Sequence, residues 1–528
     1  MGYGFSPALR TRLINSLEAE FVEIKLDRKS PAPLYLQIRN QIRRLILSRR
    51  LQAGSRLPPE RELAGALGVN RSTVVNAYRE LEADGLIESY VGRGTTVKFI
   101  PPGEEGQETD LAVQTPVWKN FYSRQAARMF NPIISNILDL VNREDIISLA
   151  VGLPSNEFYP LKEFNSIMSG LICEKGRYVF GHGPTAGHYP LREYLAGFLK
   201  ERGVETMPDN IMVLSGSQQG LDLAAKIFLE PGDALVVEEP SYMGALQVFA
   251  AAGARILGVP LDEEGLRVDI LEQILSRYRP KFIYTLPTFQ NPSGITMSVS
   301  RRRELLKLAY RFHVPILEDD PYSELYYEGE RMPSLKSMDN HGYVIYLSTF
   351  SKMLFPGLRL GWVAAPPVLA GQLVMTKQLD DFHVNSLSQW AVNEFCRRGL
   401  LEKHLMRVRE EYAVKRDLMQ ASLEELATPG FRWNRPAGGY HFWCKLPEGV
   451  KAGALLARTI EKKAAFVPSD AFFANGGGTN RLRLSFSRYP GEFIREGVRR
   501  IFEALGEMFC PGEMSGEVLT RQEVRPLV

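Results

Sequence analysis

The chain has 528 residues, of which 45% are hydrophobic and 24% charged, and these proportions exclude a wholly disordered or fibrous protein. No apolar run reaches the ~20 residues needed to span a bilayer, and the polar N-terminal segment lacks the apolar stretch of a secretory signal, so we expect a cytoplasmic protein. The cysteines form no CxxC pair, so we expect reduced, mostly buried thiols and neither a metal site nor a disulfide: Cys173, Cys396, Cys444 and Cys510.

The length predicts about three folding units. We expect an N-terminal extension over residues 1–29, a compact helix-rich block over 30–100, and a linker rich in Pro, Gly and acidic residues over 101–115. From 116 to 510, short β-branched runs alternate with longer helical patterns, which is typical of βαβ units and a mostly parallel sheet. Residues 511–528 form a polar tail.

The net charge of +3 is unevenly distributed along the chain. Residues 30–98 carry eleven Lys and Arg against six Asp and Glu, which leaves the rest slightly negative. A basic segment on a near-neutral chain is typical of a domain that binds a polyanion, although a solvated charged face has the same composition.

Within the basic block, apolar residues at helical spacing predict three helices. Their buried faces are Leu34, Ile38, Ile42 and Ile46 in the first, Leu63, Ala64 and Leu67 in the second, and Val74, Tyr78 and Leu81 in the third. Gly68 ends the second helix, Asn70 is suited to cap the third, and Gly85 ends it. Two strands over 86–90 and 95–98, around a glycine-rich turn, predict a wing-like hairpin.

The first turn of the third helix carries Arg71, Ser72 and Thr73, where side chains and free N–H groups can reach a phosphate or a base edge. By pattern alone, any small helical hairpin remains an alternative. The segments PLYLQI, LPPERELA, LGVNRSTVVNAYREL and VGRGTTV, however, resemble in order and spacing the DNA-binding domain of the GntR family. The resemblance implies an α+β winged helix-turn-helix whose contacts with double-stranded operator DNA come from Arg61, Asn70, Arg71 and Ser72, with Gly92 letting the wing approach the backbone.

In the larger part of the chain, five predicted strands each run into a polar cluster. The strands are 211–214, 234–237, 282–285, 315–317 and 344–347. The clusters are 215–220, 238–242, 290–294, 318–322 and 348–352. Because ligands of open α/β sheets bind beyond the carboxyl ends of the strands, we expect one shared site.

The chemistry of these clusters is coherent. A lysine that attacks a carbonyl needs an unprotonated amine, a pyridinium nitrogen needs a carboxylate, and a phosphate needs hydroxyls, N–H groups and an arginine. Lys352, Asp319, the turn at Ser217 and Gln218, and Arg359 supply these parts. Each residue alone has an ordinary structural explanation, such as a surface lysine or a solvated acidic turn, but the ordered set does not.

The motifs SGSQQGL, EEPSY, QNPSG, EDDPY, TFSKMLFPGLRLGW and LRLSFS resemble the class I/II aminotransferases, which have the α/β fold type I of pyridoxal-phosphate enzymes, with large and small subdomains. The resemblance implies that Lys352 is catalytic and forms the internal aldimine. It implies a cofactor site in which Asp319 pairs with the ring nitrogen, Tyr242 stacks on the ring, Asn291 and Tyr322 bond its hydroxyl, and the phosphate is held by Ser217, Gln218, Ser351 and Arg359. It assigns substrate binding to Asn291 and Arg483.

One loop departs from the family pattern. In GHGPTAGHYPLRE, His182 stands where the family has a tyrosine, unless Tyr178 or Phe180 serves instead. In the family this loop reaches the phosphate of the partner subunit, so the departure bears on dimer contact and on catalytic competence.

A winged helix, a linker and an aminotransferase-like domain resemble the MocR/GabR branch of GntR-type regulators. The resemblance implies a homodimeric, pyridoxal-phosphate-dependent transcription regulator that senses an amino acid or amine through an aldimine at Lys352. The alternative is an active aminotransferase of the 2-aminoadipate or kynurenine type, because the catalytic residues are intact and Pro321 precedes Tyr322 as in those enzymes.

Overall fold

The computed structural model describes residues 24–28, 33–47, 50–90, 94–98, 118–129, 143 and 145–509. The chain forms two compact units, Met1–Pro116 and Val117–Val528. Within the described ranges, no helix is both long and apolar enough to cross a membrane. Gly92 and Cys510 lie outside the described residues, as do the whole expected linker, the expected C-terminal tail and most of the expected N-terminal extension.

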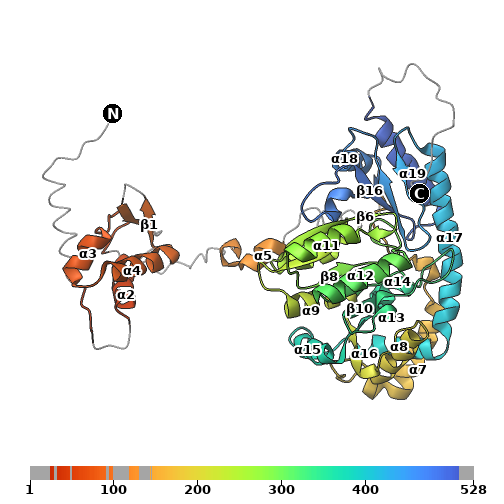
Figure 1. Ribbon diagram of the computed structural model, residues 1–528, viewed down its shortest axis with the longest axis horizontal. Coiled ribbons are helices and arrows are strands. Elements are labelled where there is room, and N and C mark those ends of the chain that lie inside the picture. Colours follow the sequence, from red (N-terminus) through yellow and green to blue (C-terminus); the bar gives the residue numbers. More distant parts are fainter. Residues whose placement is uncertain are drawn as a thin grey trace, which may run out of the picture. The chain divides into compact units, whose positions relative to one another are not determined.

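The first unit is the winged helix-turn-helix expected from the sequence. Its elements, red to orange in Figure 1, are α2 (Leu34–Leu47), α3 (Glu60–Leu67), α4 (Arg71–Ala83), β1 (Ile87–Tyr90) and β2 (Gly94–Val97). The two strands are antiparallel, with Ile87 opposite Val97. The predicted apolar faces meet in one core, in which Ile38, Ile42, Val74 and Leu81 are fully buried.

Two glycines and one asparagine shape the ends of α3 and α4. Gly68 and Gly85 follow the two helices at φ +62° and +72°, a region in which other residues are strained. Asn70 occupies the N-cap position of α4 with an extended backbone, as expected, but its side chain makes no capping hydrogen bond. The physical reason is that the Thr73 N–H, which the side chain would have bonded, donates instead to the Asn70 carbonyl oxygen.

A third extended segment supports the wing, and the sequence analysis did not predict it. Arg56 pairs with Thr96 in an antiparallel bridge. The Leu57 N–H donates to the Thr95 carbonyl oxygen, and the Val97 N–H donates to the Ser55 carbonyl oxygen, both at 2.9 Å. These bonds attach the second strand of the wing to the segment that leads into α3.

The second unit is built on an eight-stranded sheet of order β4-β11-β10-β9-β8-β5-β6-β7. Its strands are β4 (Ile211–Leu214), β5 (Ala234–Glu239), β6 (Arg255–Asp262), β7 (Gly265–Leu266), β8 (Ile283–Thr285), β9 (Ile316–Asp319), β10 (Val344–Thr349) and β11 (Gly361–Ala364). The strands from β10 to β6 are parallel, whereas β11 is antiparallel to both β10 and β4. The strand β4 therefore runs in the same direction as β10, and the five predicted strands all end at one edge of the sheet.

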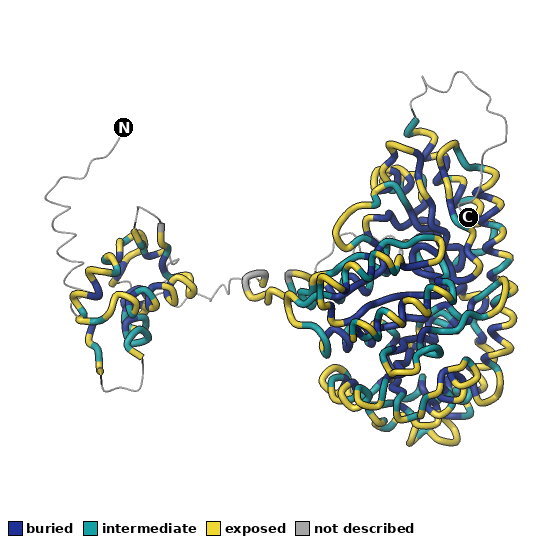
Figure 2. The backbone as a smooth tube through the Cα atoms, viewed as in Figure 1, coloured by how far each residue is buried: buried dark blue, intermediate teal, exposed yellow. Residues whose placement is uncertain are grey.

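Helices cover both faces of this sheet, so that its strands are buried (Figures 1 and 2). One face packs against α9 (Ser217–Phe228), α10 (Met243–Ala251) and α15 (Pro367–Gln378), and the other against α11 (Val268–Arg277), α12 (Val299–Phe312) and α13 (Leu335–Met338). Alternation along β5 divides the two cores: Leu235 and Val237 join the first and Val236 the second. Buried on both faces, such strands read as continuous apolar runs.

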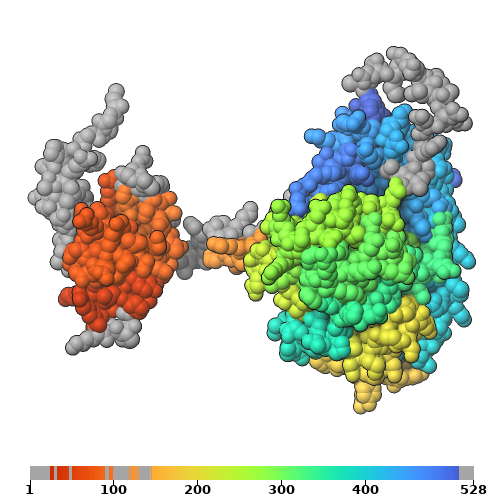
Figure 3. All heavy atoms as spheres, viewed as in Figure 1, coloured from red at the N-terminus to blue at the C-terminus, as the bar shows by residue number. Residues whose placement is uncertain are grey.

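A smaller subdomain contains a second sheet of order β12-β13-β16-β15. Its elements are β12 (Arg432–Trp433), β13 (His441–Lys445), β15 (Val467–Pro468), β16 (Arg481–Ser485), α17 (Leu400–Leu426), α18 (Ala452–Glu461) and α19 (Gly491–Gly506). This subdomain, blue in the space-filling view, shares a continuous surface with the green large sheet domain (Figure 3). The sequence expectation of large and small subdomains is thus met.

The remaining elements of the second unit connect and flank the two sheets. They are α5 (Arg124–Met129), α7 (Leu161–Val179), α8 (Tyr189–Lys200), α14 (Phe350–Met353), α16 (Ser386–Arg397), and a parallel pair of short strands, β3 (Ile147–Ser148) and β14 (Ala464–Ala465). Among the described cysteines, Cys396 and Cys444 are buried thiols, whereas Cys173 on α7 is exposed.

Replacing Leu81 by alanine is expected to destabilise the first unit alone. Leu81 is fully buried in the core of that unit, so the cavity left behind costs about 2–5 kcal/mol of unfolding free energy. All the tryptophans lie in the second unit, at Trp118, Trp362, Trp390, Trp433 and Trp443. In urea, far-UV circular dichroism should therefore show an earlier first transition while tryptophan fluorescence is unchanged.

The reciprocal control is Leu275→Ala, which removes a buried side chain from the second unit. It should move the fluorescence transition and leave the first unit unaffected. A common shift of both signals in either variant would show that the two units unfold together.

Candidate functional site

The residues expected to hold the cofactor all line one cavity of about 170 Å³ in the second unit. They come from segments that are far apart in the sequence but that meet at the same edge of the sheet. These residues are Ser217, Gln218, Tyr242, Asn291, Asp319, Tyr322, Ser351, Lys352 and Arg359. Arg359 lies two residues before β11, whose antiparallel direction brings its start to the edge at which the other strands end. Strand direction alone thus explains why these clusters meet.

One end of the cavity is suited to an anion. The helix α9 begins at Ser217 with no side-chain cap, so its first N–H groups are available to a ligand. The Arg359 guanidinium donates to the Ser215 carbonyl oxygen at 2.8 Å. Gly216 has φ +87°, and a Cβ there would lie 3.0 Å from Arg359 Nη2, so glycine permits the approach. The helix terminus and the guanidinium together favour a phosphate.

The middle of the cavity contains a carboxylate with a free oxygen. Asp319 is the last residue of β9; its Oδ2 accepts a hydrogen bond from the Tyr284 hydroxyl at 2.9 Å. Its buried Oδ1 has no hydrogen-bond partner among the described residues. Burial raises the pKa of Asp319 to about 7, and the nearby Asp320 contributes in the same direction. A protonated ring nitrogen would satisfy this oxygen and stabilise its charge, as the chemistry of a pyridine cofactor requires.

Lys352 lies in the same cavity, on the short helix that follows β10. Its Nζ donates to the Gly152 carbonyl oxygen at 2.7 Å. Burial, and then the positive charge of Arg483, lower the pKa of Lys352 to about 8, although Asp319 acts in the opposite direction. A substantial fraction of the amine is therefore neutral and nucleophilic near physiological pH.

Three polar side chains surround the space between the lysine and the carboxylate. The Tyr242 hydroxyl donates to Gln218 Oε1 at 3.3 Å, so this tyrosine is bonded to the first turn of α9, at the end of the cavity suited to an anion. The Tyr322 hydroxyl lies 3.1 Å from His441 Nε2. Asn291 Oδ1 accepts from Arg483 Nη1 at 2.7 Å, so its orientation is fixed by the neighbouring arginine.

Arg483 is a buried cation on β16 whose charge is not balanced by a neighbouring acid. It is 3% exposed, and its guanidinium donates to Asn291 and to the Ala150 carbonyl oxygen, while Nε has no partner among the described residues. It forms no ion pair with any carboxylate that the structure describes, and burial lowers its pKa to about 10. A planar guanidinium in this state is suited to a ligand carboxylate.

The loop that departs from the family pattern does not contribute to this cavity. The ring of His182 packs edge-on against His383, with ring centroids 4.4 Å apart. The alternatives Tyr178 and Phe180 are 75% and 66% exposed. None of these three side chains lines the cavity of the same chain.

The residues expected to contact DNA lie in the first unit and are exposed. Asn70, Arg71 and Ser72 gather at the N-terminus of α4, while Arg61 lies on α3. Arg71 forms an ion pair with Glu60 at 2.9 Å across the turn between the helices. Gly92 lies outside the described residues.

Sequence reasoning missed several residues that shape the cavity. Tyr284 was identified only as part of a strand, although a buried tyrosine hydroxyl needs a partner and so carried a signal. Thr349 also lines the cavity, and its Oγ1 accepts from the Ser351 N–H at 3.1 Å. Gly152 and His441 are 200 and 119 residues from their partners Lys352 and Tyr322, and nothing local pointed to either contact.

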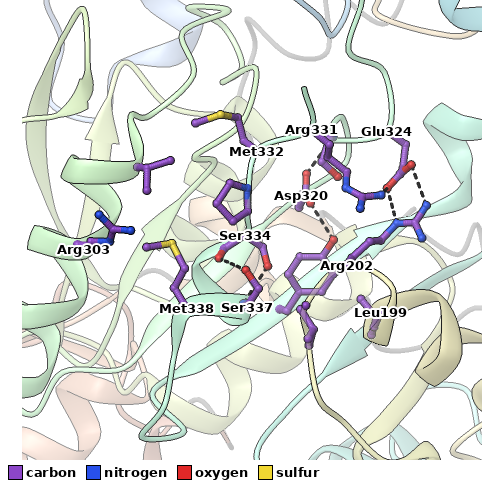
Figure 4. Close-up of a pocket in the computed structure, with 16 residues that line it drawn as sticks. Leu199, Arg202, Arg303, Asp320, Glu324, Arg331, Met332, Ser334, Ser337 and Met338 are labelled. Atoms are coloured by element: carbon purple, nitrogen blue, oxygen red, sulfur yellow. Dashed lines mark hydrogen bonds and ion pairs between the residues drawn. The ribbon is translucent and has the colours of Figure 1, made fainter. Parts of the chain in front are cut away.

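A second cavity, of about 420 Å³, contains none of the predicted site residues (Figure 4). Its carboxylates are Asp320 and Glu324. Asp320 accepts from the Tyr346 hydroxyl at 2.7 Å, and Glu324 forms ion pairs with Arg202, Arg331 and Arg409. Because these acids already have partners, the free carboxylate oxygen of the EDDPY segment is that of Asp319.

Comparisons with known proteins support both halves of this description. Residues 144–501 match the family "Aminotransferase class I and II", and residues 34–97 match "Bacterial regulatory proteins, gntR family". The aromatic-amino-acid aminotransferase 1 of Thermococcus litoralis is 40% identical over 76% of this chain and 98% of its own length.

A regulator matches both halves together. The probable rhizopine catabolism regulatory protein MocR of Rhizobium meliloti is 32% identical over 91% of this chain and 95% of its own length. Among solved structures, the α-aminoadipate aminotransferase LysN of Thermus thermophilus, complexed with N-(5'-phosphopyridoxyl)-L-leucine, is 39% identical over 74% of this chain and 98% of its own, with a TM-score of 0.70. The cavity fits the cofactor of that family, pyridoxal phosphate. The chain therefore belongs to the class I and II aminotransferase family and, with its N-terminal gntR-family domain, has the fused architecture of the MocR-type regulators.

Proposed function

We propose that the protein is a transcription regulator that binds operator DNA through its first unit and senses an amino acid or amine through pyridoxal phosphate in its second. The observation that carries the proposal is the presence in one chain of an exposed helix-turn-helix and of a cavity that contains a lysine amine of lowered pKa, an unpartnered carboxylate oxygen and a helix N-terminus suited to a phosphate. The full-length similarity to MocR supports the combination.

Each end of the cavity has its own role in the proposal. Ser217, Gln218, Ser351 and Arg359 would hold the phosphate, Asp319 would accept a hydrogen bond from the protonated ring nitrogen, and Tyr242 would pack on the ring. Pyridoxal phosphate supplies an aldehyde that condenses with primary amines and a ring that withdraws electrons. Lys352 supplies the competing amine, and its lowered pKa keeps that amine available.

The ligand in this proposal is an amino acid or a carboxylate-bearing amine. Arg483 and Asn291 bind its carboxylate, because the guanidinium is buried and has no acidic partner in the described part of the chain. With pyridoxal phosphate bound, the ligand amine would compete with the Lys352 amine for the aldehyde. For this competition to regulate transcription, the protein with bound ligand and the protein without it must favour global states that differ in their affinity for DNA.

We further propose a homodimer acting in the cytoplasm, where bacterial operators lie. The exposed aromatic rings of Tyr178 and Phe180 support a dimer face, because large exposed apolar groups near one another are typical of interfaces. They lie beside the loop of His182, which in the family reaches the partner subunit.

An active aminotransferase is the second candidate. The observation that favours it is the 40% identity to the Thermococcus enzyme over the second unit, which exceeds the 32% identity to MocR. Single-turnover absorbance measurements with 2-aminoadipate, aromatic amino acids and kynurenine separate the candidates. Complete conversion of the cofactor to its pyridoxamine form within seconds favours the enzyme, whereas a spectral change without that conversion favours the sensor.

Replacing Arg71 by alanine is expected to weaken operator binding roughly tenfold to a hundredfold, because it removes a cation from the first turn of the helix that enters the groove. Fluorescence anisotropy with operator DNA at several salt concentrations measures the effect. The control is Arg79→Ala, which removes an exposed arginine from the other half of the same helix. Equal losses in both variants would assign Arg71 a general electrostatic role only.

Replacing Lys352 by alanine is expected to abolish the visible absorption of the bound cofactor and the response of operator binding to the ligand. The first unit should still fold and bind DNA, because Lys352 lies in the other unit. Lys451→Ala, at an exposed position of the second unit, is the control. Ligand-dependent DNA binding that survives in Lys352→Ala would contradict sensing through this lysine.

Cofactor uptake by the protein stripped of pyridoxal phosphate is expected to accelerate with pH around a midpoint near 8. The lowered pKa of Lys352 means that its neutral, nucleophilic form becomes dominant above about pH 8 rather than above the ordinary value of 10.5. Stopped-flow absorbance at pH about 7 to 10 measures the rate. A rate that keeps rising toward the ordinary lysine value would show that burial does not shift this amine.

A further inference from the structure

A buried histidine contacts the tyrosine that faces the cofactor. His441 is the first residue of β13 and is 2% exposed. Its ring stands perpendicular to that of Tyr322, with an interplanar angle of 89°, and its Nε2 lies 3.1 Å from the Tyr322 hydroxyl oxygen. Tyr322 lines the cavity, whereas His441 does not, so the histidine acts on the site only through its neighbours.

The space for this ring depends on Gly152. A Cβ at position 152 would lie 2.3 Å from His441 Cε1 and 2.9 Å from its Nε2, which no side chain tolerates. The carbonyl oxygen of the same glycine accepts the hydrogen bond from Lys352 Nζ. One residue therefore positions both the reactive lysine and the histidine behind Tyr322.

The surroundings keep His441 neutral. Burial, and then the positive charges of Arg483 and Lys352, lower the pKa of His441 well below its usual value. Among the described residues, the charged and titratable groups that face it are these two cations and Tyr322, and no acid is among them. A neutral imidazole has a single N–H, on one nitrogen or the other.

The contacts of the two ring nitrogens select the tautomer. His441 Nδ1 is buried and has no hydrogen-bond partner among the described residues. Burying an unpaired N–H donor is costly, and orphaned acceptors are better tolerated than orphaned donors. The proton therefore belongs on Nε2, from which it is donated to the Tyr322 oxygen. The hydroxyl proton of Tyr322 is then free to point elsewhere, and the cavity is the polar space that Tyr322 faces.

We propose that His441 is a positioning residue that directs the hydroxyl proton of Tyr322 into the cavity, toward the ring hydroxyl of pyridoxal phosphate. This inference rests on the proposed function, because it needs the cofactor in the cavity that Tyr322 lines. A hydrogen bond donated to the ring hydroxyl oxygen stabilises negative charge there. It thereby lowers the pH at which the visible absorption of the loaded protein changes.

The opposite tautomer gives the opposite sign. If Nε2 accepted the proton of Tyr322, the histidine would draw that proton away from the cavity. Its removal would then free Tyr322 to donate to the cofactor and would lower the pH midpoint. The direction of the shift on removing His441 therefore distinguishes the two arrangements.

The test is a pH titration of the visible absorption of the full-length loaded protein. His441→Leu, which keeps the approximate volume but has no N–H, is expected to raise the midpoint by about 0.5–1 pH unit, the size of one hydrogen bond. His441→Gln, which retains an N–H donor, is expected to stay nearer the parent value. If the leucine variant does not fold, His441→Ala repeats the test without crowding Gly152.

Repeating the substitution in a protein that already lacks the Tyr322 hydroxyl shows whether the shift in the pH midpoint depends on that tyrosine. In a Tyr322→Phe protein, adding His441→Leu is expected to produce no further shift. The control is His313→Leu, which removes an exposed histidine whose Nδ1 lies 2.9 Å from the Tyr343 hydroxyl at the end of α12 and which does not line the cavity. This control should leave the midpoint unchanged.

A lowered midpoint in His441→Leu, or a shift that persists in the Tyr322→Phe background, would overturn the inference. Failure of the proposed function has a different result: the parent protein itself would take up no pyridoxal phosphate and show no visible band. Operator binding, measured in parallel, should be the same in all these variants because α4 lies in the other unit.

Discussion

Burial of an acid and an amine in one small cavity is the constraint on which the second unit depends. The same cause, removal from water, raises the pKa of Asp319 to about 7 and lowers that of Lys352 to about 8. The carboxylate is not fully satisfied by the protein, since one oxygen of Asp319 has no partner in the described residues. Such an arrangement is unfavourable for an empty protein and favourable for one that binds a cation and an aldehyde, so its stability is linked to its ligand.

The fold maintains this arrangement with contacts that span most of the second unit. The Gly152 carbonyl oxygen accepts from Lys352, and Arg483 of the small sheet orients Asn291 of the large domain. The cavity is therefore sensitive to the relative position of the two subdomains. A ligand that changes what Arg483 or Lys352 contacts acts on groups from both sheets at once, which is what a sensor requires.

Much of this architecture could be predicted from the sequence, because it depends on local patterns. Apolar runs followed by polar clusters located five of the eight strands of the large sheet, and the order of motifs located the residues that line the cavity. The contacts of Tyr284, Gly152 and His441 could not be predicted, because pairing between distant segments is set by sheet register and not by spacing. The N-cap position of Asn70 was predicted correctly, but its side chain makes no capping bond, and the Thr73 N–H donates to the Asn70 carbonyl oxygen instead.

The antiparallel strand β11 has a consequence for the size of the ligand. It separates β4, which leads to the anion cradle, from β10, which leads to Lys352. Two strand spacings amount to about 9–10 Å. The sheet therefore sets the distance between the strand end that leads to the phosphate site and the strand end that leads to Lys352. A molecule that carries only the phosphate or only the aldehyde contacts the residues at only one of these two strand ends. The backbone thus selects for length before any side chain selects for chemistry.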